Sequence, residues 1–336
     1  MTMPHAGDDL RPASAARKPL FEYLPVSFFG SVMGLTGLSV GWRLASARYG
    51  LPALIGDAIG WGALAVFILL ALAYGAKAVT AWTSVLSEFR HPVAGNLFGT
   101  ALISLLLMPF VLQPLSPILA AAAWMLGTGG MILFAFVIVS RWMGSRHQLA
   151  HATPAWIVPV VGLLDVPLAG PALGLQQTQT LMMFSLSIGL FFAVPLFTLV
   201  FARLVFEEPL APAQRPTLMI LVAPFAVGFS SYVATFGRVD AVAEGLFLIA
   251  LFVFAVLVGR LRDLPRCCPF RISWWAVSFP VAAMAVAALR YAGHVQAIAA
   301  DVLALLLLGL ATVIIVGLAI RTLVGIARGE LRQLAG

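Results

Sequence analysis

One carboxylate, Asp165, stands inside an apolar stretch of the chain, between Leu164 and Val166. An ionisable group at membrane depth is costly and is usually functional. If Asp165 faces a water-filled cavity, its carboxyl group could take up and release a proton during transport. The second interpretation places it at the end of a short helix, at the outer membrane interface. The sequence favours neither, and Asp165 is our candidate protonation site.

Two further pairs of residues, one of histidines and one of cysteines, have side chains that can bind metals or react. His147 and His151 have the i, i+4 spacing that can bind a metal on one helix face, but no acidic or cysteine partner lies beside them. Cys267 and Cys268 are adjacent in a basic segment that we place in the cytosol, where stable disulfides are rare. We therefore expect a solvated histidine pair, no metal site, no cofactor and no chemistry at the cysteines.

The sequence lacks the signatures of membrane enzymes and pumps. It has no phosphate-binding loop, no HExxH, no GxSxG and no paired carboxylates within its apolar stretches. The cluster Gly127–Gly130 lacks the strand–turn–helix context that a phosphate loop requires. We therefore expect that the protein is not an enzyme, and a structural scaffold is the other weakly supported class.

The elements that position these residues are apolar helices. Hydrophobic residues make up 62% of the 336 positions and charged residues only 10%, which places the chain in a lipid bilayer. A helix needs about 20 apolar residues to cross the bilayer. Ten runs fit, and they predict an all-α membrane protein. The runs are 25–45, 53–76, 95–113, 117–140, 155–170, 178–202, 217–236, 241–260, 274–292 and 297–320.

The positions of Lys and Arg predict how the chain crosses the membrane. With ten spans and the N-terminus inside, sixteen of the 20 cations fall on the cytoplasmic side. This asymmetry predicts a multi-pass protein of the inner (plasma) membrane with both termini in the cytoplasm, and it explains the net charge of +7 without nucleic-acid binding. Arg43 and Arg290 lie near the outer interface, where a long side chain can reach water. The outer side carries Arg43, Arg48, Arg238 and Arg290.

The chain divides into three parts. Residues 1–20 are polar and proline-rich and are predicted to be a disordered cytoplasmic segment. Residues 21–326 form the ten-helix domain, and 327–336 form a short cytoplasmic tail. The first apolar run exceeds the roughly 7–15 residues of a signal peptide core, so we expect a membrane helix there.

Prolines and glycines distinguish alternate runs. A proline inside a helix kinks it and frees carbonyl groups, which neighbours or cavity water must satisfy. The odd runs are therefore predicted to form an inner ring that faces water, and helix N-terminal amides in that ring can attract anions weakly. In the first run, Gly30-xxx-Gly34 and Gly37-xxx-Gly41 predict close helix packing. The odd runs carry Pro25, Pro109, Pro159, Pro167, Pro224 and Pro280, and Pro195 lies in the sixth run.

Several segments match a known family over about residues 20–325. They are Leu24-Pro25-Val26-Ser27-Phe28-Phe29-Gly30, Gly34-Leu35, His91-Pro92, Ala223-Pro224 and Trp274-Trp275-Ala276-Val277-Ser278-Phe279-Pro280. The chain resembles the tellurite-resistance/dicarboxylate transporter family, which includes TehA-like bacterial proteins, yeast sulfite and malate transporters and the slow-type anion channels of plant guard cells.

The resemblance implies ten helices as five hairpins around a pseudo-five-fold central pore, in a protomer that assembles as a homotrimer. It implies that Phe279 is the gate that blocks this pore. Pro280 directly follows that position, and Asp165 is unexpected near a path for anions. The pore-lining or kink candidates are Pro25, Phe29, Gly30, Pro109, Pro159, Pro224 and Pro280.

Two functions fit these expectations. The first is passage of small inorganic or organic anions through a pore in each protomer, occluded by the phenylalanine. The alternative is a proton-linked exporter of dicarboxylates, sulfite or related oxyanions on the same fold, for which Asp165 would carry the proton.

Overall fold

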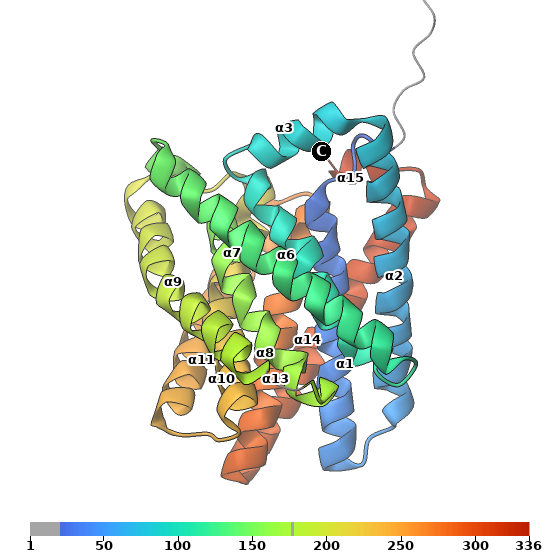
Figure 1. The fold of residues 1–336 in the computed structure, drawn as a ribbon, viewed down its shortest axis with the longest axis vertical. Helices are drawn as coiled ribbons and strands as arrows, with labels where there is room; N and C mark the ends of the chain where they lie inside the picture. The colour runs from blue at the N-terminus through green and yellow to red at the C-terminus, as the bar shows by residue number, and fades with distance from the viewer. Residues whose placement is uncertain (1–20, 176–177, 336) are drawn as a thin grey trace, which may run out of the picture.

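The computed structural model describes residues 21–175 and 178–335, and helices and turns account for the secondary structure of these residues, with no strand among them. Nine of the described helical segments are long and apolar enough to cross a membrane. A tenth, η1 (Val26–Phe29) with α1 (Gly30–Tyr49), is comparably long but carries Arg43 and Arg48. The all-α membrane fold is therefore confirmed (Figure 1).

Five long, unbroken helices form the outside of the bundle. Only 22% to 44% of the residues in their most apolar windows are buried, as expected where side chains face lipid. One of them, α9, contains Pro195 without interruption. The five are α2 (Ala53–Thr80), α6 (Pro117–Gly144), α9 (Thr178–Phe206), α11 (Ala241–Leu261) and α14 (Ile298–Ala327).

The segments between them are broken and buried. In four of these alternate spans, 61% to 83% of the corresponding windows are buried. Each begins with a 3-10 helix and changes to an α-helix. After η1–α1, they are η2 (Ala94–Phe98) with α4 (Gly99–Leu107) and α5 (Pro109–Leu112); η4 (Pro154–Ile157), α7 (Val158–Val161), η5 (Gly162–Asp165), α8 (Val166–Ala169) and η6 (Gly170–Leu173); η7 (Pro212–Val222) with α10 (Ala223–Phe236); and η8 (Ile272–Val277) with α13 (Ser278–Val295).

These inner segments close a ring. α1 packs on α4, α4 on η5 and α8, both of these on α10, α10 on α13, and α13 back on α1. Each also contacts the long helix that follows it, as α1 does with α2 and α13 with α14. The pseudo-five-fold symmetry itself stays a prediction.

The predicted spans agree with the observed segments to within about five residues at most ends. The last one is longer, because α14 continues to Ala327. A short helix, α15 (Leu331–Ala335), follows and buries Leu334, so the segment predicted as a tail packs on the bundle. The predicted disordered segment, 1–20, lies outside the described residues. The remaining short helices are α3 (Trp82–Arg90), η3 (Leu149–His151) and α12 (Leu264–Cys267).

The two ends of the bundle are distinct. At one end, which we call the α3 face, lie α3, α15 and the start of α1 (Figure 1). The Arg332 guanidinium lies 5.2 Å from the centre of the Tyr23 ring there, so both ends of the described chain meet on this face. The opposite end, the Gly50 face, carries the α1–α2 turn at Gly50 and the end of α13 at Gln296.

A buried ion pair fixes the start of α1 at the α3 face. Glu88 of α3 accepts hydrogen bonds from the Val26 amide and the Tyr74 hydroxyl, at 2.7 and 3.0 Å. Lys77 of α2 donates to Glu88 and to the Leu24 carbonyl, both at 2.7 Å. Each charge is therefore satisfied as burial requires, and α1, α2 and α3 are held together.

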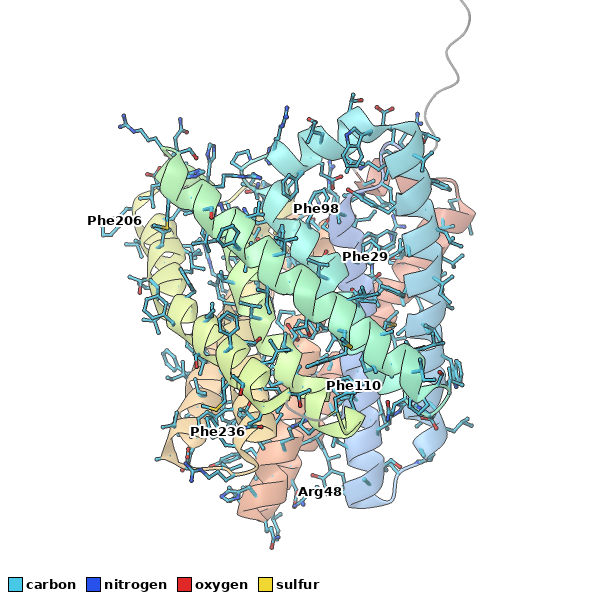
Figure 2. The ribbon with its side chains drawn as sticks, viewed as in Figure 1. Phe29, Arg48, Phe98, Phe110, Phe206 and Phe236 are labelled. Atoms are coloured by element: carbon cyan, nitrogen blue, oxygen red, sulfur yellow. A yellow bond between two sulfur atoms is a disulfide. The ribbon has the colours of Figure 1, made fainter. Side chains whose placement is uncertain are left out.

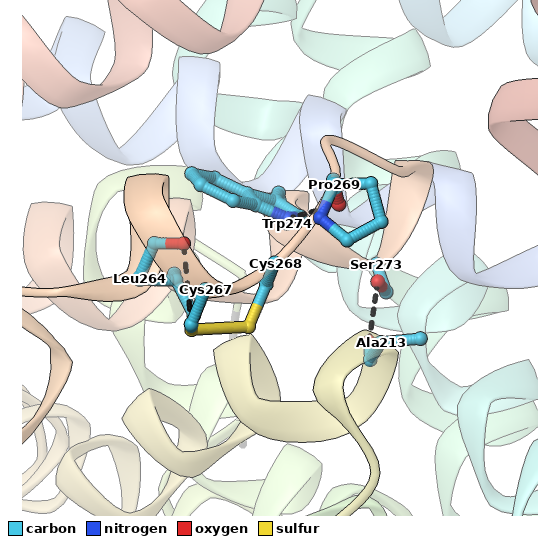
Figure 3. The surroundings of a disulfide bond; sticks show 7 residues. All are labelled: Ala213, Leu264, Cys267, Cys268, Pro269, Ser273 and Trp274. Carbon is cyan, nitrogen blue, oxygen red and sulfur yellow. Dashed lines mark hydrogen bonds between the residues drawn. A yellow bond between two sulfur atoms is a disulfide. The ribbon is translucent and has the colours of Figure 1, made fainter.

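The two cysteines differ from the expectation. Their sulfur atoms are bonded to one another, across adjacent positions at the end of α12 (Figure 3). Cys267 Sγ also contacts the Leu264 carbonyl, and Ser273 donates a hydrogen bond to the Ala213 carbonyl beside the pair. We did not expect this bond, because the charge rule places the segment in the cytosol, a reducing environment in which stable disulfides are rare.

Candidate functional site

The inner segments surround a cavity of about 90 Å³ in the half of the bundle nearer the α3 face. Its lining is mostly apolar, and all five inner spans contribute to it. We call it the α3-side cavity. Its lining includes Ser27, Gly30, Met33, Thr100, Ile103, Val161, Asp165, Thr217, Val227, Ser273, Trp275, Phe279 and Pro280.

A second cavity of about 30 Å³ lies in the half nearer the Gly50 face. The same five spans line it, with residues from their later turns. We call it the Gly50-side cavity. Its lining consists of Gly37, Val40, Leu107, Phe110, Leu168, Val227, Ser230, Phe279, Ala283, Val286 and Arg290. Phe29, near the α3 face, and Phe110, nearer the Gly50 face, mark the two halves in Figure 2.

Phe279 lines both cavities, as Val227 also does. The ring belongs to the first turn of α13, and the residue is 7% exposed. α1 packs closely beside it: a Cβ atom on Gly37 would come within 2.9 Å of Ala282 Cβ, and it would touch Phe279 Cδ2 at 3.7 Å. Phe279 therefore lies at the border between the two cavities.

The prolines lie where the inner segments break or begin. Pro109 begins α5, and Pro159 and Pro224 are the second residues of α7 and α10. Pro25 precedes η1, and Pro280 is the third residue of α13. Of these, only Pro280 lines either cavity. The others act through the backbone, at the changes between 3-10 and α geometry.

The two remaining candidates lie side by side in sequence but differ in surroundings. Gly30 lines the α3-side cavity, and a Cβ atom there would lie 3.7 Å from the Trp275 carbonyl oxygen. Phe29 lies in neither lining. Its ring packs edge-on against Phe67 and Tyr74 of α2, with ring centres 6.1 and 6.4 Å apart. Phe29 is thus a packing residue between the inner ring and α2.

Asp165 faces the α3-side cavity and is 2% exposed. It ends η5, in the middle of the most fragmented span, and so does not lie at the outer interface. Its Oδ1 is buried without a hydrogen-bond partner within residues 21–175 and 178–335. The carboxyl group therefore lies inside the bundle, at the wall of the α3-side cavity.

Three hydroxyl groups of the α3-side cavity direct their hydrogen atoms to the protein backbone. Thr100 donates to the Leu97 carbonyl at 2.7 Å, Thr217 to Gln214 at 2.6 Å and Ser273 to Ala213 at 2.7 Å. These three hydroxyl groups are therefore not free to donate to a dissolved anion.

Sequence reasoning missed two residues of the Gly50-side cavity, Arg290 and Ser230. Arg290 was expected to extend into water at the outer interface, but its Nε is buried and has no hydrogen-bond partner in the described part of the chain. The spacing of residues in the sequence could have placed Arg290 on the same face of α13 as Phe279. That face carries Phe279, Ala283, Val286 and Arg290, at positions i, i+4, i+7 and i+11 of the helix.

Comparisons with known proteins agree with this architecture. Residues 23–323 match the family model SLAC1, described as voltage-dependent anion channel. The chain is 26% identical over 306 residues to the S-type anion channel SLAH2 of Arabidopsis thaliana, covering 89% of this chain and 58% of that protein. It is 27% identical over 279 residues to the tellurite resistance protein TehA homolog of Haemophilus influenzae, covering 80% of this chain and 81% of that protein.

A third relative is the guard cell S-type anion channel SLAC1 of Arabidopsis thaliana, 25% identical over 317 residues. The match covers 91% of this chain and 56% of that protein, so the chain spans less than three fifths of the length of these two plant relatives, SLAH2 and SLAC1. The family match extends over nearly all of the ten helical segments and confirms the resemblance found in the sequence. The chain belongs to the voltage-dependent anion channel family, SLAC1.

Proposed function

We propose that this protein conducts small anions across the membrane, through a path that joins the α3-side and Gly50-side cavities and is closed by Phe279. The observation that carries the proposal is that one aromatic ring lines both cavities. An apolar ring excludes water from a narrow path and forms a hydrophobic constriction. The names of the relatives, S-type anion channels among them, support anions as the transported class.

The proposed orientation places the α3 face in the cytoplasm. Sixteen of the 20 cations fall on that side when the observed spans are threaded through a membrane. The membrane is the inner (plasma) membrane, and both termini are cytoplasmic. The proposed assembly is a homotrimer with one path in each protomer, as the family resemblance implies.

Flux measurements test the proposal directly. Purified protein in liposomes should pass chloride, nitrate and larger anions at rates set by their own gradients, and Phe279→Ala protein should pass them faster. Liposomes without protein and liposomes loaded with the organic anion gluconate provide the controls. Equal flux with and without protein, for both wild type and Phe279→Ala, would refute the function.

A second function rests on Asp165. On the same fold, a proton-linked exporter of dicarboxylates, sulfite or related oxyanions would use this carboxyl group as its protonation site. The observation that favours it is the buried, unpartnered Oδ1 in the α3-side cavity. An ionised carboxylate repels an anion in the cavity, whereas the protonated group does not, so proton uptake would admit the anion.

We expect Asp165→Asn to retain anion flux, because the amide keeps the shape of the side chain and removes the charge that opposes an anion. The reversal potential should follow the anion gradient alone in both proteins, and any pH dependence of the flux should disappear in the variant. Planar-bilayer recording with opposed proton and chloride gradients measures both. A wild-type reversal potential that moves with the proton gradient, and stops doing so in Asp165→Asn, would instead establish the exporter.

A further inference from the structure

Arg290 is a partly buried cation on the Gly50 side without a carboxylate partner. The other arginines on this side are paired: Arg43 with Asp57 at 2.9 Å, Arg48 with Asp301 at 2.7 Å and Arg238 with Asp240 at 3.2 Å. No ion pair or hydrogen bond joins Arg290 to another residue of the described chain. A charged group that is partly desolvated without an ionic partner is costly and so indicates a function.

Three carboxylates on the Gly50 side are already engaged. Asp301 also accepts from the Tyr49 hydroxyl at 2.7 Å, and Asp240 from the Tyr232 hydroxyl at 2.7 Å. Glu244 accepts a 2.7 Å hydrogen bond from Tyr291, the residue that follows Arg290. The fold thus supplies partners to its other charges on this side and leaves the guanidinium group of Arg290 for the cavity.

Ser230 of α10 adds a second free donor to the same cavity. It is 3% exposed, and its Oγ has no hydrogen-bond partner among the described residues. This differs from Thr100, Thr217 and Ser273 on the other side of Phe279, whose hydroxyl groups donate to carbonyl oxygens. An anion needs donors, and a guanidinium group with a hydroxyl group supplies several.

The geometry of α13 directs Arg290 inward. Side chains of a helix point toward its N-terminus, so the guanidinium group is directed back along the face that ends at Phe279. The remaining lining is apolar apart from backbone, with Val40, Leu107 and Leu168 as examples. In such surroundings the field of one cation is screened less than in water.

We propose that Arg290 and Ser230 form a binding site for one small monovalent inorganic anion, a halide or nitrate, in the Gly50-side cavity. One unpaired cation balances one negative charge. The cavity of about 30 Å³ has room for about two water-sized groups, which excludes a dicarboxylate. The proposal rests on the anion path described above and assigns its Gly50-side half a specific ligand class.

The test measures binding apart from conduction. The melting temperature of the purified protein is recorded with increasing sodium chloride or sodium nitrate, at constant ionic strength with sodium gluconate. A ligand that binds the folded protein raises the melting temperature, so wild type should show a saturating rise. Arg290→Gln should weaken the apparent affinity about tenfold or more, as expected for the loss of a charged hydrogen-bond partner.

Two further variants keep the test interpretable. Ser230→Ala should weaken the affinity less than Arg290→Gln, because it removes a neutral donor. Arg238→Gln removes an exposed cation from the same face and should leave the response unchanged. If Arg290→Gln does not fold, an unchanged response in Ser230→Ala would count against the site.

Flux through liposomes, measured on the same preparations, separates the two proposals. Anion flux without a saturating response in wild type, or a wild-type response in Arg290→Gln, overturns the binding site and leaves the channel function standing. A saturating response that depends on Arg290 in a protein without flux, even as Phe279→Ala, supports the site and refutes the channel function.

Discussion

Replacing Phe279 by alanine should raise anion conductance about tenfold or more, the factor that follows from lowering a barrier by about 1.4 kcal/mol. The ring lies between cavities of about 90 and 30 Å³. Truncation to the Cβ atom removes the aromatic carbons that separate them and joins the two voids. Wild type and Phe279→Ala, recorded in planar bilayers at matched protein amounts, give the ratio.

Stability separates a gate from an ordinary buried aromatic. Truncation of a packed phenylalanine typically costs about 3–5 kcal/mol. Phe279 borders cavities on two sides, so its truncation should cost less than that range. Phe229 is the matched control, because it lies in α10, is 0% exposed and lines neither cavity. Phe229→Ala should lower the folded yield without increased conductance.

Lipid-facing phenylalanines give a second control. Phe191 in α9 and Phe252 in α11 are each 70% exposed on the outer helices. Alanine at either position should leave conductance at the wild-type value. If folded Phe279→Ala protein conducts no better than wild type, Phe279 is not the gate.

Much of the fold follows from the sequence, because a bilayer limits what apolar segments can do. Runs of about 20 apolar residues have one way to satisfy their backbone groups in lipid, which is to form helices. The alternation of prolines distinguished broken from continuous spans, and the structure buries the broken ones. The close packing predicted by Gly34 and Gly37 is confirmed, since α13 lies against both.

The remaining features depend on contacts between distant segments. The 3-10 starts of the inner spans, such as η7 over Pro212–Val222, carry no distinct local pattern. Phe29 belongs to a family motif, yet its aromatic side chain packs on α2, because its position in the circle of inner helices directs the side chain outward. A span boundary alone could not show whether Arg290 meets a carboxylate, since its possible partners come from other helices.

Gly34 is the position where a small change should have the largest effect on stability. In α1, an added Cβ atom would overlap Ser278 Oγ and Cβ and lie 3.3 Å from the Ser278 backbone carbon. Ser278 cannot move freely, because its hydroxyl donates to the Trp275 and Gly30 carbonyls at 2.6 and 3.1 Å. Gly34→Val must therefore separate α1 from α13, at a cost of about 3 kcal/mol or more.

Gly62 faces outward, so Gly62→Val is the control for a glycine-to-valine change that causes no clash. An added Cβ atom at Gly62 in α2 would meet nothing within 4 Å, so Gly62→Val should unfold at nearly the wild-type temperature. Gly34→Val should unfold at a much lower one, or yield little folded protein. The smaller variant Gly34→Ala should be partly rescued by Ser278→Gly, because the second change removes the two atoms that the new methyl group overlaps. Equal unfolding temperatures for Gly34→Val and Gly62→Val would show that α1 and α13 are not in close contact at this turn. Because Ser278 directly precedes Phe279, the proposed position of the gate would then be wrong as well.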